Sequence, residues 1–93
     1  MTDPIGETPR NEVDDAGAVL RFGVDMCKKL SENKHEAHWS TVGNYWLLNR
    51  LKMEVNELQD SLDGDQDSII SECADVANFA MMIADNARNH ELG

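Results

Sequence analysis

The chain has 93 residues, of which 18 are acidic and 8 are basic, so its formal net charge at pH 7 is −10. A chain of this length forms at most one domain with a modest core, and small domains gain much from oligomerisation. The negative charge argues against nucleic acids and anionic membranes as partners, because lysine and arginine supply most of that affinity. An anionic substrate is compatible with this charge when metal ions mediate the contact.

The sequence also bears on the compartment in which the protein works. It has no N-terminal hydrophobic stretch of the signal-peptide kind and no apolar run near the roughly 18 residues that span a bilayer. We therefore expect a cytoplasmic protein. Cys27 and Cys73 fall on the apolar stripes of helical patterns, and we interpret them as small buried side chains of a reduced protein.

The first part of the chain divides into a tail and a helix. Residues 1–13 contain both prolines and almost no apolar side chains, which indicates a mobile N-terminal tail. Residues 14–93 are expected to form a single helical domain. Asp14 and Asp15 are expected to form the N-cap region of its first helix. From Ala16 apolar and small residues recur with helical periodicity, so this helix should run to about Asn33.

A connection and a second helix follow. Residues 34–43 have no sustained period and are expected to link the two helices through a short turn. Residues 44–63 carry one stripe of leucine and valine, which predicts the second helix. Gly64 is well placed to end that helix in the left-handed conformation.

The third helix is expected to be capped by Asp65 or Asp67 and to extend to about Asn89. One broad face of it is apolar and rich in alanine, yet Phe79 and Met82 lie well off that face. A helix with apolar residues on more than one side is normally buried on more than one side. We therefore expect an all-α antiparallel bundle of about three main helices, completed by homo-oligomerisation into a dimer or tetramer.

Four carboxylates form two pairs with i, i+3 spacing: Glu54 with Glu57, and Glu72 with Asp75. Such spacing puts both members of a pair on one face of a helix, and antiparallel packing of the two helices would bring the pairs to one cleft. Four carboxylates in one cleft repel one another unless a cation lies among them, and Mg²⁺ prefers oxygen ligands. The alternative is a non-enzymatic interaction module, in which both pairs form a solvated or partner-binding surface.

The residues around these pairs extend the pattern. Residues 51–58 read Leu-Lys-Met-Glu-Val-Asn-Glu-Leu, and residues 72–79 read Glu-Cys-Ala-Asp-Val-Ala-Asn-Phe. Together they resemble the two-part motif of the MazG-like all-α nucleoside triphosphate pyrophosphohydrolases, over roughly residues 39–85. The resemblance implies a helical fold completed by dimerisation or higher assembly. It also implies cleavage of a nucleoside triphosphate into its monophosphate and pyrophosphate in nucleotide-pool housekeeping, with Mg²⁺ or, as a substitute, Mn²⁺.

The same resemblance assigns roles to the four carboxylates. Glu54, Glu57, Glu72 and Asp75 match the metal ligands of the family. Metal ions would neutralise the triphosphate and lower the pKa of a bound water. A carboxylate that is not fully committed to metal could take the proton of that water. Glu54 and Glu57 are the two candidates for this catalytic role, and the sequence does not choose between them.

Three residues are candidate contacts for phosphate or sugar oxygens. Asn78 lies one turn after Asp75 on the same face, where hydration on the helix surface is the alternative role. Lys34 and Arg50 are candidate phosphate contacts. Arg50 is also four residues before Glu54, in the less favourable order for a helix pair, and a structural role is at least as good an interpretation.

The segment with histidine and tryptophan offers a candidate base pocket. His38, Trp39 and Trp46 could line a pocket that binds a nucleobase by hydrogen bonding and stacking. Trp39 and Trp46 could instead be anchors of the core or of an interface. Glu32 and His35 form one E-x-x-H pair, whereas a di-iron bundle needs two such motifs, so we do not favour that class.

Overall fold

The computed structural model describes residues 12–33 and 37–92, and within them the side chains of residues 14–33 and 37–89. The described backbone forms α1 (Glu12–Glu32), the short 3₁₀ helix η1 (Trp39–Thr41), α2 (Asn44–Ser61) and α3 (Gln66–Leu92). No strand occurs in these residues, so the predicted all-α class is confirmed. The expected tail lies mostly outside the described residues, and α1 begins at Glu12, before the predicted cap region at Asp14 and Asp15.

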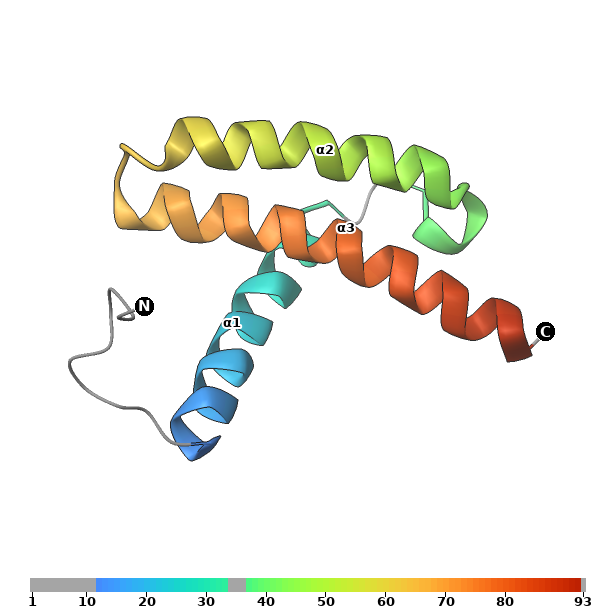
Figure 1. Ribbon diagram of the computed structural model, residues 1–93, viewed down its shortest axis with the longest axis horizontal. Helices are drawn as coiled ribbons and strands as arrows, with labels where there is room; N and C mark the ends of the chain where they lie inside the picture. Colours follow the sequence, from blue (N-terminus) through green and yellow to red (C-terminus); the bar gives the residue numbers. More distant parts are fainter. Residues whose placement is uncertain (1–11, 34–36, 93) are drawn as a thin grey trace, which may run out of the picture.

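The helices α2 and α3 form an antiparallel hairpin, and α1 crosses α3 and projects away from that hairpin (Figure 1). Contacts join α3 to α1, to η1 and to α2, so α3 is the central element of the described chain. None of the described helices combines the length and the apolarity that crossing a bilayer requires.

The turn between α2 and α3 differs from the predicted one at Gly64. No described glycine has a positive φ, so the prediction that Gly64 ends the helix in the left-handed conformation was wrong. The helix ends instead through tight backbone bonds, in which the N–H of Leu62 donates to the carbonyl of Gln59 and that of Gly64 to the carbonyl of Ser61, at 2.8 Å for the latter. A Cβ at position 64 would lie 3.1 Å from that Ser61 oxygen. Glycine therefore lets the Ser61 carbonyl lie close to the backbone of residue 64.

The start of α3 was predicted more closely. Asp65 Oδ1 accepts a hydrogen bond of 2.8 Å from the backbone N–H of Ser68, as an N-cap residue does. Of the two candidate caps, Asp65 is therefore the one used. The bonds from Ser68 lower the pKa of Asp65.

The connection between α1 and α2 is held against α3 by side-chain bonds. Trp39 Nε1 donates to Asp85 Oδ2 at 2.9 Å. Asn86 Nδ2 donates to the backbone carbonyl of Trp39 at 3.0 Å and to Oδ1 of Asn44 at 3.1 Å. These bonds fix both η1 and the first turn of α2, so the expected short turn is present and anchored.

The core of the described chain is small. Leu47 and Ala74 are its fully buried apolar side chains, with exposed fractions of 1% and 0%. Phe79 and Met82 are half-buried and line a pocket inside the chain. The side of α3 with these two residues is thus covered by the chain itself, whereas Ala80 on the alanine-rich side is exposed.

The projecting helix α1 leaves an apolar face uncovered. Val19, Leu20 and Val24 are 70%, 72% and 67% exposed. Cys27 follows on the same side of the helix and is exposed too, so its predicted burial was wrong, while Cys73 on α3 is half-buried; both are free. The reason is that α3 is the main described neighbour of α1 and contacts it near its C-terminal end, at Met26 and Lys29, while the rest of α1 projects away (Figure 1).

Candidate metal centre and adjoining pocket

Three carboxylates from the α2–α3 hairpin lie together. Oxygen atoms of Glu54, Glu57 and Glu72 lie within 4.8 Å of one another. The i, i+3 spacing turns both glutamates of α2 to the side of α3 that carries Glu72, as the sequence predicts. Asp75, the fourth predicted ligand, lies one turn further along α3 and is paired with Lys29 of α1 instead.

Glu54 is the most strongly perturbed of these groups. Its residue is only 7% exposed. Burial, a hydrogen bond shared with Glu57, and the negative charges of Glu57 and Asp75 raise its pKa to about 7, although Arg50 acts in the opposite direction. A carboxylate in this position is therefore only partly ionised near neutral pH when no cation is bound.

The pKa values of Glu72 and Asp75 on α3 are raised as well. Burial, followed by the charges of Asp75 and Glu57, raises the pKa of Glu72. Burial also raises the pKa of Asp75, although Lys29 lowers it. Oε2 of Glu72 is buried and has no hydrogen-bond partner among the described residues. Unpaired carboxylate oxygens in a group with too little positive charge fit a divalent cation with oxygen ligands.

Arg50 lies between the carboxylates and a neighbouring pocket. Its Nη2 is 3.7 Å from Oε2 of Glu54, so Arg50 forms an intrahelical ion pair, in line with the structural role weighed as the alternative. Its guanidinium carbon lies 5.6 Å from the ring centroid of Phe79 and 5.9 Å from that of Trp46. These cation–π contacts hold the guanidinium group at the border of the pocket.

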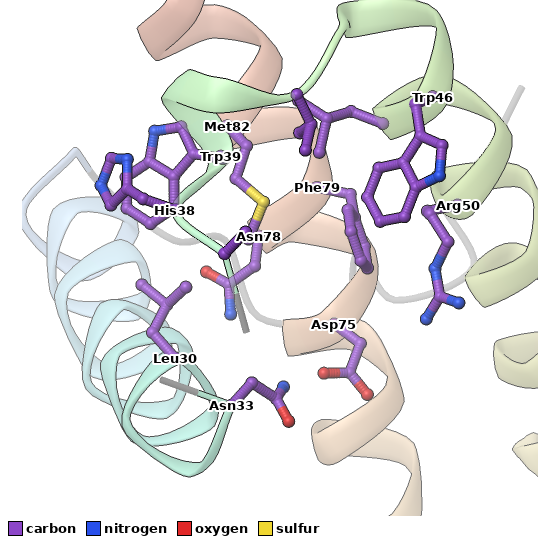
Figure 2. Close-up of a pocket in the computed structure, with 13 residues that line it drawn as sticks. Leu30, Asn33, His38, Trp39, Trp46, Arg50, Asp75, Asn78, Phe79 and Met82 are labelled. Atoms are coloured by element: carbon purple, nitrogen blue, oxygen red, sulfur yellow. The ribbon is translucent and has the colours of Figure 1, made fainter. Parts of the chain in front are cut away.

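The pocket has a volume of about 650 Å³, a size typical of small-molecule sites. Figure 2 shows the rings of His38 and Trp39 on one side of it and those of Trp46 and Phe79 on the other. His38 and Trp39 stack with their ring centroids 4.0 Å apart. The carboxylate of Asp75 and the guanidinium of Arg50 also line the pocket, so its polar end adjoins the acidic group.

Asn78 lies in the wall of this pocket and is only 4% exposed. Its Nδ2 donates to the backbone carbonyl of Met26 in α1 at 3.1 Å, whereas its Oδ1 is buried without a hydrogen-bond partner among the described residues. Hydration on the helix surface, the alternative role weighed from the sequence, is therefore wrong. An unpaired buried acceptor costs free energy that a donor on a bound ligand can recover.

The structure thus gathers most of the predicted site residues. Arg50, Asn78, His38 and Trp39 line one pocket, next to the three clustered glutamates. Lys34, like His35 of the E-x-x-H pair, lies outside the described residues. Sequence reasoning missed Lys29, because nothing in the periodicity of α1 tells where that helix crosses α3.

Comparison with known proteins assigns neither a family nor a function to this site. Comparison of the chain with protein-family models, with curated proteins and with solved structures finds no match. The resemblance to the MazG-like enzymes therefore remains a prediction that rests on the two segments that carry it.

Proposed function

We propose that this protein is a cytoplasmic, Mg²⁺-dependent pyrophosphohydrolase that cleaves canonical or modified (deoxy)nucleoside triphosphates to the monophosphate and pyrophosphate. The observation that carries this proposal is the juxtaposition of the three clustered glutamates with an aromatic-lined pocket of about 650 Å³. The carboxylate end suits a metal-bound phosphate chain, and the aromatic walls suit a planar base. The E-x-x-E and E-x-x-D segments support the same function.

In the proposed site, Glu54, Glu57 and Glu72 hold the cation, joined by Asp75. Mg²⁺, or Mn²⁺ in its place, would supply neutralisation of the phosphate charge and a bound water of lowered pKa. Glu54 or Glu57, whichever is not fully committed to the metal ion, would accept the proton of the attacking water.

The pocket residues position the remainder of the substrate. The facing pairs of rings, His38 with Trp39 and Trp46 with Phe79, would stack on the base. The unpaired Oδ1 of Asn78 would accept a hydrogen bond from the base or the sugar. Arg50 stands at the polar end, where its guanidinium group can contact phosphate oxygens.

The proposal includes self-association into a homodimer or homotetramer. The described chain buries few apolar side chains fully, yet Val19, Leu20 and Val24 expose most of their surface on α1. Burial of such side chains contributes roughly 1.5–3 kcal/mol each. A second copy that covers this face of α1 would supply the apolar contacts that the single chain lacks.

Substitution of Leu20 by Asp is expected to shift the protein to a smaller assembly, because a carboxylate on this apolar face cannot be buried without a large desolvation penalty. Analytical ultracentrifugation at several protein concentrations measures the change. Arg21→Asp is the control, since it places the same side chain on the neighbouring exposed position outside the apolar face. Identical sedimentation of both variants and the wild type would contradict an interface at α1.

Pyrophosphate release from a panel of ribo- and deoxyribonucleoside triphosphates tests the activity. We expect release with Mg²⁺, none in excess EDTA, and little from Glu57→Gln or Asp75→Asn. Asp60→Asn is the matched control for the latter, because Asp60 is an exposed acid of α2 outside the carboxylate group. An inactive wild type whose melting temperature does not respond to Mg²⁺ would overturn the proposal in favour of an interaction module.

A further inference from the structure

Lys29 reaches the candidate metal centre from a third helix. Its Nζ lies 3.6 Å from Oδ2 of Asp75 on α3 and 3.6 Å from Oε1 of Glu32, one turn on in α1. The side chains of Lys29 and Asp75 are only 23% and 17% exposed. Among the described residues, Lys29 and Arg50 are the cations that pair with the four site carboxylates.

The pairing divides the four carboxylates into two sets. The oxygen atoms of Glu54, Glu57 and Glu72 lie together. Asp75 instead pairs with the ammonium group of Lys29 and lines the pocket. A divalent cation among the glutamates would draw Asp75 towards itself and repel the ammonium group of Lys29. The positive charge of Lys29 therefore competes with a metal ion for the same carboxylate.

Lys29 is able to leave Asp75 without unfolding the helix that carries it. An ammonium group on a flexible four-carbon stem makes no fixed bidentate contact and finds new partners at little cost. A phosphate chain that binds at the polar end of the pocket would bring anionic oxygens next to Asp75, within the reach of that stem. An ammonium group displaced from the carboxylate then has an anionic partner close by.

We propose that Lys29 exchanges partners when the site is filled: Nζ holds Asp75 in the metal-free protein and contacts phosphate oxygens of the nucleotide in the loaded one. This inference rests on the proposed function. It makes Lys29 both a competitor of the metal ion and a binding residue for the substrate. A lysine that merely ties α1 to α3 has neither property.

The two roles predict effects of opposite sign for Lys29→Met, which keeps the aliphatic stem and removes the charge. Without nucleotide, Mg²⁺ should bind about 2- to 5-fold more tightly, as expected when a competing, partly exposed ion pair is removed. With Mg²⁺ present, nucleotide should bind at least ~10-fold more weakly, because a charge-assisted contact is lost. A structural tether would weaken both affinities together.

Isothermal titration calorimetry on the full chain measures both affinities. The probes are MgCl₂ alone and then the non-hydrolysable α,β-imido analogues of the four deoxynucleoside triphosphates with MgCl₂. Lys28→Met is the matched control, because Lys28 is the exposed neighbour on the same helix, and it should leave both affinities unchanged. Lys29→Arg keeps the positive charge, so it should bind Mg²⁺ no more tightly than the wild type and should retain nucleotide binding. This second variant allows the same test if Lys29→Met folds poorly.

The outcomes separate this proposal from the one on which it rests. A wild type that binds no Mg²⁺ overturns the metal centre, and the exchange with it. A wild type that binds Mg²⁺ and nucleotide while Lys29→Met weakens both, or changes neither, overturns the exchange alone. Tighter Mg²⁺ binding together with weaker nucleotide binding establishes it.

Discussion

Glu54→Gln is expected to lower the rate of pyrophosphate release by more than ~100-fold. Loss of a residue that only hydrogen-bonds to a metal ligand already lowers metal affinity or activity about 10- to 100-fold, and Glu54 is itself a proposed ligand. The same substitution should raise the stability of the metal-free protein at pH 8. Glu54 is buried beside Glu57 and Asp75, so its ionised form is repelled on two sides and poorly hydrated. An amide of the same shape removes that repulsion while leaving the packing in place.

Initial rates with Mg²⁺ and urea unfolding in EDTA provide the two measurements. At pH 5 the wild-type carboxyl is already protonated, so the gain in the free energy of unfolding should be present at pH 8 and nearly absent at pH 5. Asp60→Asn, which removes an exposed acid from the same helix, controls for the loss of one negative charge. Wild-type activity in Glu54→Gln, or a variant that is less stable at pH 8, would show that the carboxylates do not form a strained cation site.

Metal-free protein is expected to lose stability as the pH rises from 5 to 8. The folded-state pKa values of Glu54, Glu72 and Asp75 are raised. The stability that each group contributes is therefore fully present at pH values below its pKa in the unfolded chain, and it is lost as the pH rises through its pKa in the folded protein. For Glu54, whose pKa is raised to about 7 from the ordinary value of 4.5, the loss is on the order of 3 kcal/mol. The lowered pKa of Asp65 acts in the opposite sense, in the acid range.

Mg²⁺ should cancel this loss, because the ion binds the deprotonated carboxylates. A concentration of 100 times the dissociation constant stabilises the folded state by about 2.7 kcal/mol, and less at pH 5, where protons compete. Melting curves at pH 5, 6, 7 and 8, in EDTA and in MgCl₂, check the expectation. A stability that falls equally with pH in both solutions would argue against metal binding at these residues, and Glu54→Gln should flatten the EDTA curve.

Helix positions and the acidic group could be predicted because both depend on spacing within single helices. The periodicity of residues 44–63 gave the start of α2 correctly and its end, Ser61, to within two residues. The i, i+3 spacing of Glu54 and Glu57 placed them together, and the short turn at Gly64 forces α3 to return antiparallel, which brings Glu72 to them. No knowledge of the crossing of α1 was needed for any of this.

Several features that could not be predicted depend on how α1 lies on α3. Lys29 meets Asp75, and Asn78 donates to the carbonyl of Met26, only because these helices cross at those residues. Helix periodicity tells which side of a helix is apolar but not which neighbour covers it. The exposure of Cys27 has the same origin, since α3 contacts α1 at Met26 and Lys29 and leaves the side chain of Cys27 uncovered.

Trp39 and Trp46 are the two tryptophans of the chain, and both line the pocket. Trp39 stacks on His38 and is tied to Asp85, while the ring of Trp46 lies near the guanidinium group of Arg50. Intrinsic fluorescence of this protein therefore comes almost entirely from the walls of one cavity. The unmodified chain thus carries its own optical reporter, whose emission is expected to change when a ligand enters that cavity.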